Sequence, residues 1–220
     1  MKISKLTMTS AMALALAACG GSSDSADPDT IVSSGILEIE LPTDPSAYGT
    51  EVETLIGQVT TANETGSLID PANSAVYDGT WGAEVNDYVG GDGALIGGDA
   101  QITVNLDSTS ATATFGVEFA EENDGGNMTS LTVVGDIFED SGGLTIASGL
   151  LSGGLEGDFL VEGEETYSFT GALDGAFADV DGTNTAFGQF DGTLTNTTEG
   201  SPDEGLTDDV GGAFHATESP

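Results

Sequence analysis

Apolar and polar residues alternate along most of the chain after residue 75, and this period of two restricts the fold more than any other feature. Ile102, Val104 and Leu106 are separated by single polar residues, and the run from Ala111 to Phe119 alternates in the same way. Successive side chains of a strand point to opposite faces, so these runs predict strands with one buried face. No helical pattern lies between them. Residues 72–220 are therefore predicted to form an all-β domain of antiparallel strands.

Glycine-rich clusters divide the alternating runs. The chain contains 33 glycines in 220 residues, about twice the usual usage of roughly 7%. The clusters at residues 123–126, 140–143, 152–154 and 179–182 are interpreted as turns. Frequent turns predict a sandwich or a barrel, and glycines inside strands, as in residues 187–192, favour the bends of a closing sheet. We therefore expect a β-barrel.

One segment before the strands has the period of a helix. Its apolar positions are Val52, Leu55, Ile56 and Val59. Thr50 and Glu53 have the spacing of a capping box. The pattern predicts one short helix near residues 51–61, which we expect to pack across one end of the barrel.

The first residues have the layout of a secretory signal. Lys2 and Lys5 precede a stretch without charge, residues 6–18, that is shorter than the about 20 apolar residues of a membrane-spanning helix. Residues 16–19, Leu-Ala-Ala-Cys, are similar to the bacterial lipobox. The resemblance implies that Cys19 is acylated and that cleavage leaves it as the first residue. An ordinary signal followed by a chance cysteine is the alternative.

Cys19 is the only cysteine, so it has no disulfide partner within the chain. Gly20 follows it, where an Asp would resemble an inner-membrane retention signal. We therefore expect delivery to the outer membrane, with attachment through N-terminal acyl chains. The predicted organisation is a lipoprotein signal peptide at residues 1–18, an acidic tether with the short helix at residues 19–71, and the barrel at residues 72–220.

The charge of the chain is extreme. It has 38 Asp and Glu residues, and its only basic side chains are Lys2 and Lys5. No carboxylate beyond the signal can pair with a lysine or arginine of that part of the chain, and nucleic acid and anionic lipid headgroups are repelled. One interpretation is a solvated acidic surface suited to salty water, typical of a halotolerant protein. The other is a binding surface for a divalent cation or a basic partner.

No calcium motif fits. With Gly182 at position 6 of an EF-hand loop, Phe177 falls at position 1 and Gly188 at position 12, where carboxylates are needed. Residues 90–100 have no repeat of the glycine-rich calcium type. We predict no metal site and no cofactor.

No catalytic constellation is evident either. His215 is the single histidine, and because it alternates with Phe214 it is expected to face away from the core. The sequence contains no G-x-S-x-G elbow and no phosphate-binding loop. With 38 carboxylates, any acidic pair can be imagined as a glycosidase couple, so pairing carries no information. We expect no catalytic residues and no enzyme activity.

Four segments suggest a family. They are residues 77–82 (YDGTWG), 100–106 (AQITVNL), 187–192 (FGQFDG) and 211–217 (GGAFHAT). Together with the lipobox, these segments resemble the C-terminal barrel of transferrin-binding protein B-like bacterial lipoproteins, over about residues 72–220. The link between the last two motifs, residues 193–210, is longer and more acidic than the family pattern.

The resemblance implies an eight-stranded barrel on an outer-membrane lipoprotein, often displayed on the cell surface, that binds a protein or another ligand. Transferrin itself is not implied, because the chain has no counterpart of the host-binding lobe. We therefore expect a non-catalytic binding or accessory module whose partner is an unknown protein or small-molecule nutrient, and no nucleic acid. The alternatives are a lipocalin-like carrier of a small apolar ligand and a structural or calcium-dependent surface protein.

Overall fold

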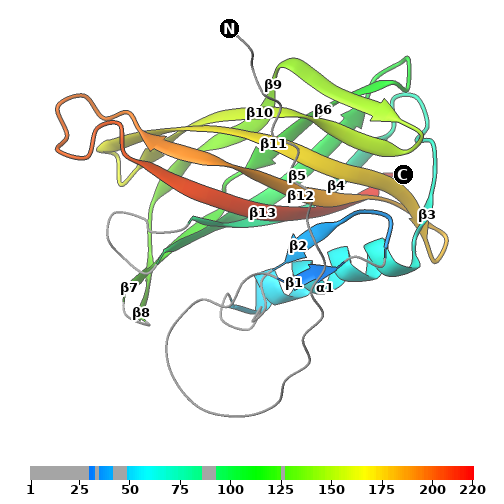
Figure 1. The fold of residues 1–220 in the computed structure, drawn as a ribbon, viewed down its shortest axis with the longest axis horizontal. Helices are drawn as coiled ribbons and strands as arrows, with labels where there is room; N and C mark the ends of the chain where they lie inside the picture. The colour runs from blue at the N-terminus through cyan, green and yellow to red at the C-terminus, as the bar shows by residue number, and fades with distance from the viewer. Residues whose placement is uncertain (1–29, 33–34, 42–48, 86–92, 125–126) are drawn as a thin grey trace, which may run out of the picture.

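A computed structural model describes residues 30–32, 35–41, 49–85, 93–124 and 127–220 (Figure 1). Its elements in chain order are β1 (Thr30–Val32), β2 (Ile39–Leu41), α1 (Gly49–Thr65), β3 (Ser67–Leu68), β4 (Val76–Val85), β5 (Ala94–Val104), β6 (Ser110–Gly116), β7 (Phe119–Asp124), β8 (Asn127–Ser130), β9 (Val133–Ala147), β10 (Leu150–Val161), β11 (Glu165–Val180), β12 (Thr183–Asn196) and β13 (Thr207–Glu218).

Eight of the strands close into an antiparallel barrel. β4 pairs with β13 on one side and with β5 on the other, and the remaining neighbours follow in the order β13, β12, β11, β10, β9, β6 and β5. Closure leaves the wall of the barrel without an edge strand. The all-β prediction, the antiparallel pairing and the number of strands implied by the family resemblance are confirmed. Residues 19–29 of the expected tether lie outside the described residues.

The predicted run from Ala111 to Phe119 is not one strand. β6 ends at Gly116, and the chain turns before β7 begins at Phe119. Two hydrogen bonds hold this corner: the Trp81 indole Nε1 donates to the Gly116 carbonyl at 2.8 Å, and the Glu118 amide donates to the Gly97 carbonyl at 2.9 Å. The alternating pattern does not show this corner, because the contacts that hold it come from Trp81 and Gly97, which are far away in the sequence.

Two of the four predicted turns are wrong, and the one at residues 123–126 includes residues 125–126, which lie outside the described residues. Residues 140–143 and 152–154 lie inside β9 and β10, where a register shift between Gly153 and Leu155 marks a bulge. The bulge residues include Asp140, whose carboxylate accepts a hydrogen bond from the Gly142 amide at 2.7 Å. The turn predicted at residues 179–182 is confirmed: Asp181 and Gly182 both have positive φ (53° and 86°) between β11 and β12, as a two-residue hairpin turn requires.

Aromatic side chains fill the middle of the barrel. The ring centroid of Phe190 lies 5.8 Å from that of Trp81, 5.7 Å from that of Phe115 and 6.2 Å from that of Phe169. Phe214 adds a further ring, 5.6 Å from Phe115. All five side chains are at most 1% exposed. Each such ring pair contributes about 0.5–1.5 kcal/mol beyond the burial of its area.

Inward-facing glycines make room for these rings. A Cβ on Gly212 would lie 2.4 Å from Cζ of Phe190, and a Cβ on Gly192 would lie 2.6 Å from Cζ of Phe169. Phe190 and Gly212 are directly opposite each other in β12 and β13. The mixture of glycine and phenylalanine in the last two motifs therefore has a packing reason: a ring on one strand covers a glycine on its neighbour.

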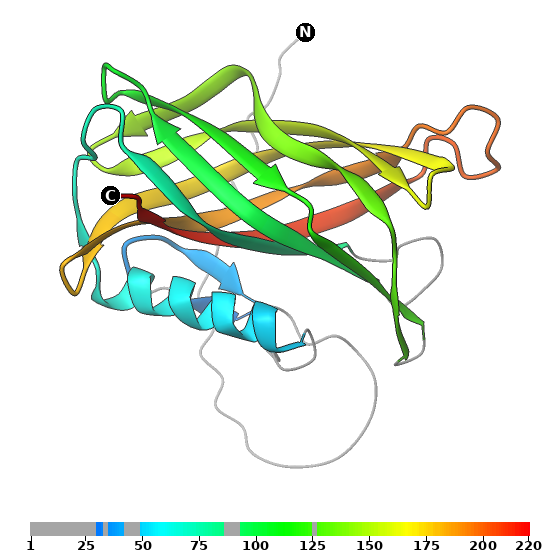
Figure 2. The same cartoon turned by 180° about the vertical axis from the view of Figure 1, so that it is seen from behind.

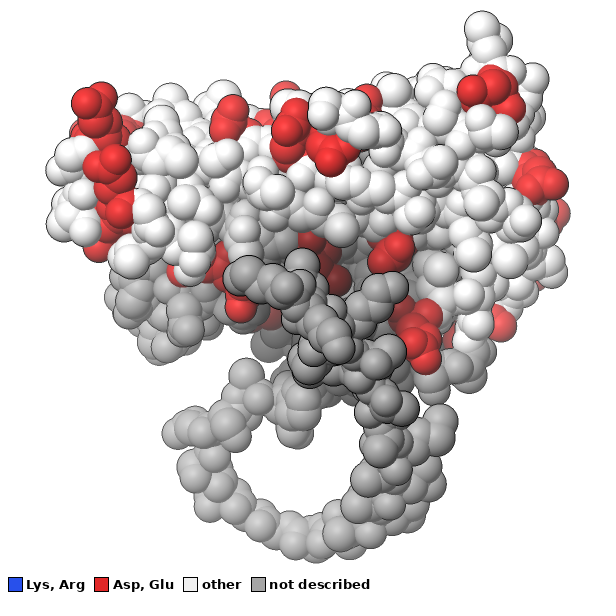
Figure 3. Space-filling view, turned by 45° about the horizontal axis from the view of Figure 1, so that its top comes forward, with Lys and Arg blue, Asp and Glu red and all other residues white. Residues whose placement is uncertain are grey.

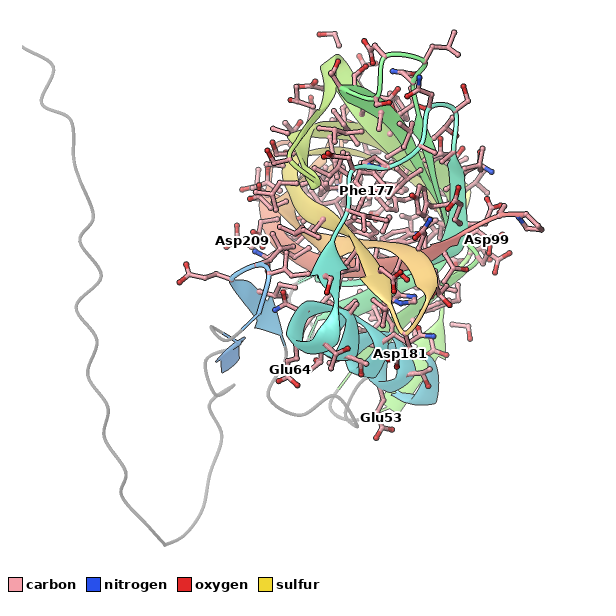
Figure 4. All side chains as sticks on the ribbon, turned by 90° about the vertical axis from the view of Figure 1, so that its right-hand side faces the viewer. Glu53, Glu64, Asp99, Phe177, Asp181 and Asp209 are labelled. Carbon is pink, nitrogen blue, oxygen red and sulfur yellow. The ribbon has the colours of Figure 1, made fainter. Side chains whose placement is uncertain are left out.

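Tyr77 is buried inside the barrel with its hydroxyl unpartnered. Its ring centroid lies 5.1 Å from that of Phe177, which Figure 4 shows within the barrel. No protein group of the described residues accepts or donates a hydrogen bond at this hydroxyl. Burial, and then the nearby charge of Glu218, raises the pKa of Tyr77 to about 12. The hydroxyl therefore stays neutral in the folded protein at a pH where an exposed tyrosine ionises.

Replacing Tyr77 by phenylalanine should raise the free energy of unfolding by about 1 kcal/mol, because an unpartnered buried hydroxyl is removed without loss of volume. The wild-type protein should also lose stability as pH rises from about 10 to 12, because the unfolded chain then loses the Tyr77 proton that the folded chain keeps. Urea unfolding at pH 8 and at pH 11 checks both points. A variant less stable than the wild type at pH 8 would show that the hydroxyl has a stabilising partner.

α1 lies along the outside of the barrel wall (Figure 2), so the expectation that it crosses one end is wrong. The predicted face of the helix is the buried one, and it rests on outward-facing residues of β11, β12 and β13. These residues are Ala176, Ala178, Phe187 and Ala213. The helix runs from Gly49 to Thr65, longer than the predicted residues 51–61, with Thr50 inside it. Among the described residues, no helix is long and apolar enough to cross a membrane.

Asn63 ties the end of α1 to the segment before it. Its side chain is 1% exposed; the Leu37 amide donates to Oδ1 at 2.7 Å, and Nδ2 donates to the Leu37 carbonyl at 3.0 Å. The Ile36 amide also donates to the Asn63 carbonyl at 3.0 Å. Because a buried amide is costly unless hydrogen-bonded, these contacts fix residues 35–38 against the helix.

Candidate functional site

The two residues predicted to direct the protein to a membrane, Cys19 and Gly20, lie outside the described residues. Acylation of Cys19 and the sorting role of Gly20 therefore stay predictions. The remaining candidates for function are in the barrel and on its outer surface.

His215 faces outward from β13, opposite Thr80 of β4 and Phe187 of β12, whereas Phe214 points into the core. Burial against the wall lowers the pKa of this imidazole below its ordinary value, so the ring is neutral at pH 7. Within the described part of the chain, no three His, Cys, Asp or Glu side chains are arranged to hold a metal ion.

Described residues line a small hollow inside the barrel. The hollow lies near one end and has a volume of about 20 Å³. Its lining is apolar and consists of Val85, Ala94, Ile96, Leu131, Val133, Phe159, Val161 and Leu194. This volume is about that of one water molecule, and an apolar lining gives a water no hydrogen-bond partners. A carrier of an apolar ligand needs an internal cavity far larger than this hollow.

A larger space lies outside the barrel, in a groove of about 400 Å³ between α1 and the wall. Val52, Thr54, Leu55 and Gln58 of α1 form one side of it. Thr80, Trp81, Gly98, Glu118 and Phe119 form the other side, from β4, β5 and the corner between β6 and β7. The volume falls in the range of about 300–1,000 Å³ that is typical of ligand sites.

Two adjacent glycines of β5 shape this groove. A Cβ on Gly97 would lie 2.5 Å from Cζ of Phe119, and a Cβ on Gly98 would lie 2.6 Å from the Glu118 amide nitrogen. The corner after β6 can therefore lie directly on β5 and place Phe119 against the outer wall. The absence of side chains at Gly97 and Gly98 therefore determines the position of Glu118 and Phe119 on the barrel side of the groove.

Carboxylates border the groove. Glu118 lines it, and Asp99 is directly opposite Thr80 in the pairing of β4 with β5 and points outward (Figure 4). The only basic side chains of the chain are Lys2 and Lys5, which precede the described residues. On the face that Figure 3 presents, carboxylates are spread over the described residues and no lysine or arginine is visible. The groove has apolar residues on both sides. Because of the carboxylates around it, it also lies in a negative potential.

The sequence contains one signal for the groove. The apolar face of α1 needs a partner, and outward positions 176, 178, 187 and 213 are apolar where most outward positions of these strands are polar. Those two observations place the helix on this wall. No local pattern shows that the corner at Gly116 brings Phe119 next to Leu55.

No known protein-family model matches the chain, and no curated protein matches it.

Proposed function

We propose that this protein is a lipid-anchored outer-membrane lipoprotein whose barrel is a non-catalytic binding or accessory module for a protein or a nutrient ligand. The lipobox-like residues 16–19 carry the anchor, because they place the only cysteine of the chain directly after an exported-looking signal. The resemblance to transferrin-binding protein B-like lipoproteins supports both the location and the binding role. The proposal is compatible with display on the cell surface and with a periplasmic orientation.

The arrangement of the barrel favours binding on its outside. The aromatic core occupies the interior, and the hollow near one end has only about 20 Å³, whereas the groove beside α1 has about 400 Å³. Of these two spaces, the groove is the one large enough for a ligand, which favours binding outside the barrel over a lipocalin-like carrier. The acidic surface, which has no cation of its own beyond Lys5, supports a partner that carries positive charge.

Mass spectrometry of the intact protein from its membrane tests the anchor. We expect a polypeptide that begins at Cys19 and carries acyl mass. Such acyl chains would hold it on the membrane, because each buried methylene contributes roughly 0.8 kcal/mol and an acyl chain of about 15 methylenes contributes on the order of 10 kcal/mol. Cys19→Ala should leave the signal uncleaved, and Gly20→Asp should shift the protein toward the inner membrane. A mature chain without acyl mass, or one cut at another bond, would overturn the proposed location.

A further inference from the structure

The groove between α1 and the wall combines two chemistries. Leu55, Val52 and Phe119 give it apolar sides, and Gln58, Thr80 and Glu118 bring polar groups to it. An occupant that satisfies both needs an apolar group for the sides and a hydrogen-bond donor for the carboxylate. We propose that this groove docks a segment of a partner protein in which an arginine or lysine stands next to an apolar residue. The inference rests on the proposed binding function and names the chemistry of its partner.

The charge of the occupant follows from the carboxylates around the groove. Glu118 lines the groove and Asp99 borders it, with no basic side chain in the described residues to offset them. An acidic or phosphorylated segment is therefore repelled, whereas a guanidinium or ammonium group makes charge-assisted hydrogen bonds. The apolar sides add affinity in proportion to the area that the partner covers.

The size of the negative field favours a protein over a small amine. The chain carries 38 carboxylates, and their field reaches about 10 Å into a solution of 0.1 M salt. A protein with several basic residues is attracted by much of this surface, which speeds its association, whereas a single ammonium group gains from one contact. The groove then selects the segment in which an apolar side chain accompanies the charge.

Three pentapeptides, blocked at both ends and titrated into the purified full-length protein at 0.15 M NaCl, test the proposal. Leu-Arg-Leu-Arg-Leu has both features, Gly-Arg-Gly-Arg-Gly lacks the apolar side chains, and Leu-Glu-Leu-Glu-Leu reverses the charge. Calorimetry should give a dissociation constant below about 1 mM for the first. We expect binding at least about tenfold weaker for the second, because the apolar contacts are lost. The third should not bind.

Matched variants locate the binding. Glu118→Gln removes a charge that lines the groove and should weaken Leu-Arg-Leu-Arg-Leu about two- to fivefold, as expected for an exposed ion pair. Glu156→Gln removes the same charge from an exposed position on β10 and should leave the affinity within error. Thr80→Trp fills the groove and should abolish binding, whereas Thr170→Trp on the outer face of β11 should not. Circular dichroism confirms that each variant is folded.

Three results would overturn the proposal: absence of binding, equal affinity for the peptides with and without leucine, or equal loss in Glu118→Gln and Glu156→Gln. The last two would reduce the interaction to general attraction by the acidic surface. These outcomes are independent of the anchor, because acyl mass on Cys19 is measured separately. Failure of peptide binding with acylated Cys19 removes the groove as the docking site and leaves the lipoprotein location intact.

Discussion

Replacing Phe190 by alanine should lower the free energy of unfolding by about 3–5 kcal/mol, which corresponds to about 10 °C in the melting temperature of a domain of this size. Phe190 is 1% exposed and its ring contacts those of Trp81, Phe115 and Phe169. The alanine variant loses these contacts, and the closed wall cannot collapse into the space. Urea unfolding followed by circular dichroism measures the loss.

Gly212 supplies the control for this prediction. A Cβ at this position would lie 2.4 Å from Cζ of Phe190 and 2.8 Å from Cβ of Ala83, so Gly212→Ala should also be destabilising. The double variant Gly212→Ala/Phe190→Leu should lose less free energy of unfolding than the sum of the two single variants, because the shorter leucine side chain relieves the contact with the new Cβ. Strict additivity, or a loss below about 1 kcal/mol in Phe190→Ala, would contradict the packing described for this core.

The alternation of residues predicted the inward face of the barrel well because one physical rule sets it. Ile102 and Val104 of β5 and Phe115 of β6 point inward as the period of two requires. The same rule failed for Leu106, which is 81% exposed beyond the end of β5, and for Phe119, which faces α1 after the corner. Periodicity gives the face of a residue within a strand and carries no information on where the strand ends.

Glycine was the less reliable signal. The glycines at positions 142, 143, 153 and 154 resemble a pair of turns in sequence. They lie instead at a bulge, where the register between β9 and β10 shifts. Asp181 and Gly182, with the same composition, do form a turn. What separates the cases is the partner across the strand: a Cβ on Gly153 would lie 2.6 Å from the Gly143 carbonyl oxygen. A contact of this kind depends on pairing, so it could not be predicted from composition.

Raising the salt concentration from 20 mM to 0.5 M NaCl should raise the melting temperature by several degrees. The chain has 38 carboxylates and, after Lys5, no lysine or arginine, so close pairs of like charge occur on the barrel. Asp136 and Asp158 are one pair, directly opposite each other on β9 and β10 and both exposed. Two charges about 5 Å apart repel by about 0.8 kcal/mol in water, and the screening length falls to a few ångströms at high salt.

The pair itself gives the sharper experiment. Asp158→Asn removes the repulsion with Asp136 and should raise the melting temperature at 20 mM NaCl by about 1–3 °C, and by less at 0.5 M. Asp209→Asn removes the same charge from β13, where the residue opposite is the neutral Thr193, and should have the smaller effect at low salt. Asp158→Lys should raise the melting temperature more than Asp158→Asn does, because it replaces the repulsion of Asp136 by attraction across the strands. If Asp158→Asn and Asp209→Asn respond equally at both salt concentrations, total charge determines the salt dependence and the cross-strand pair has no special part in it.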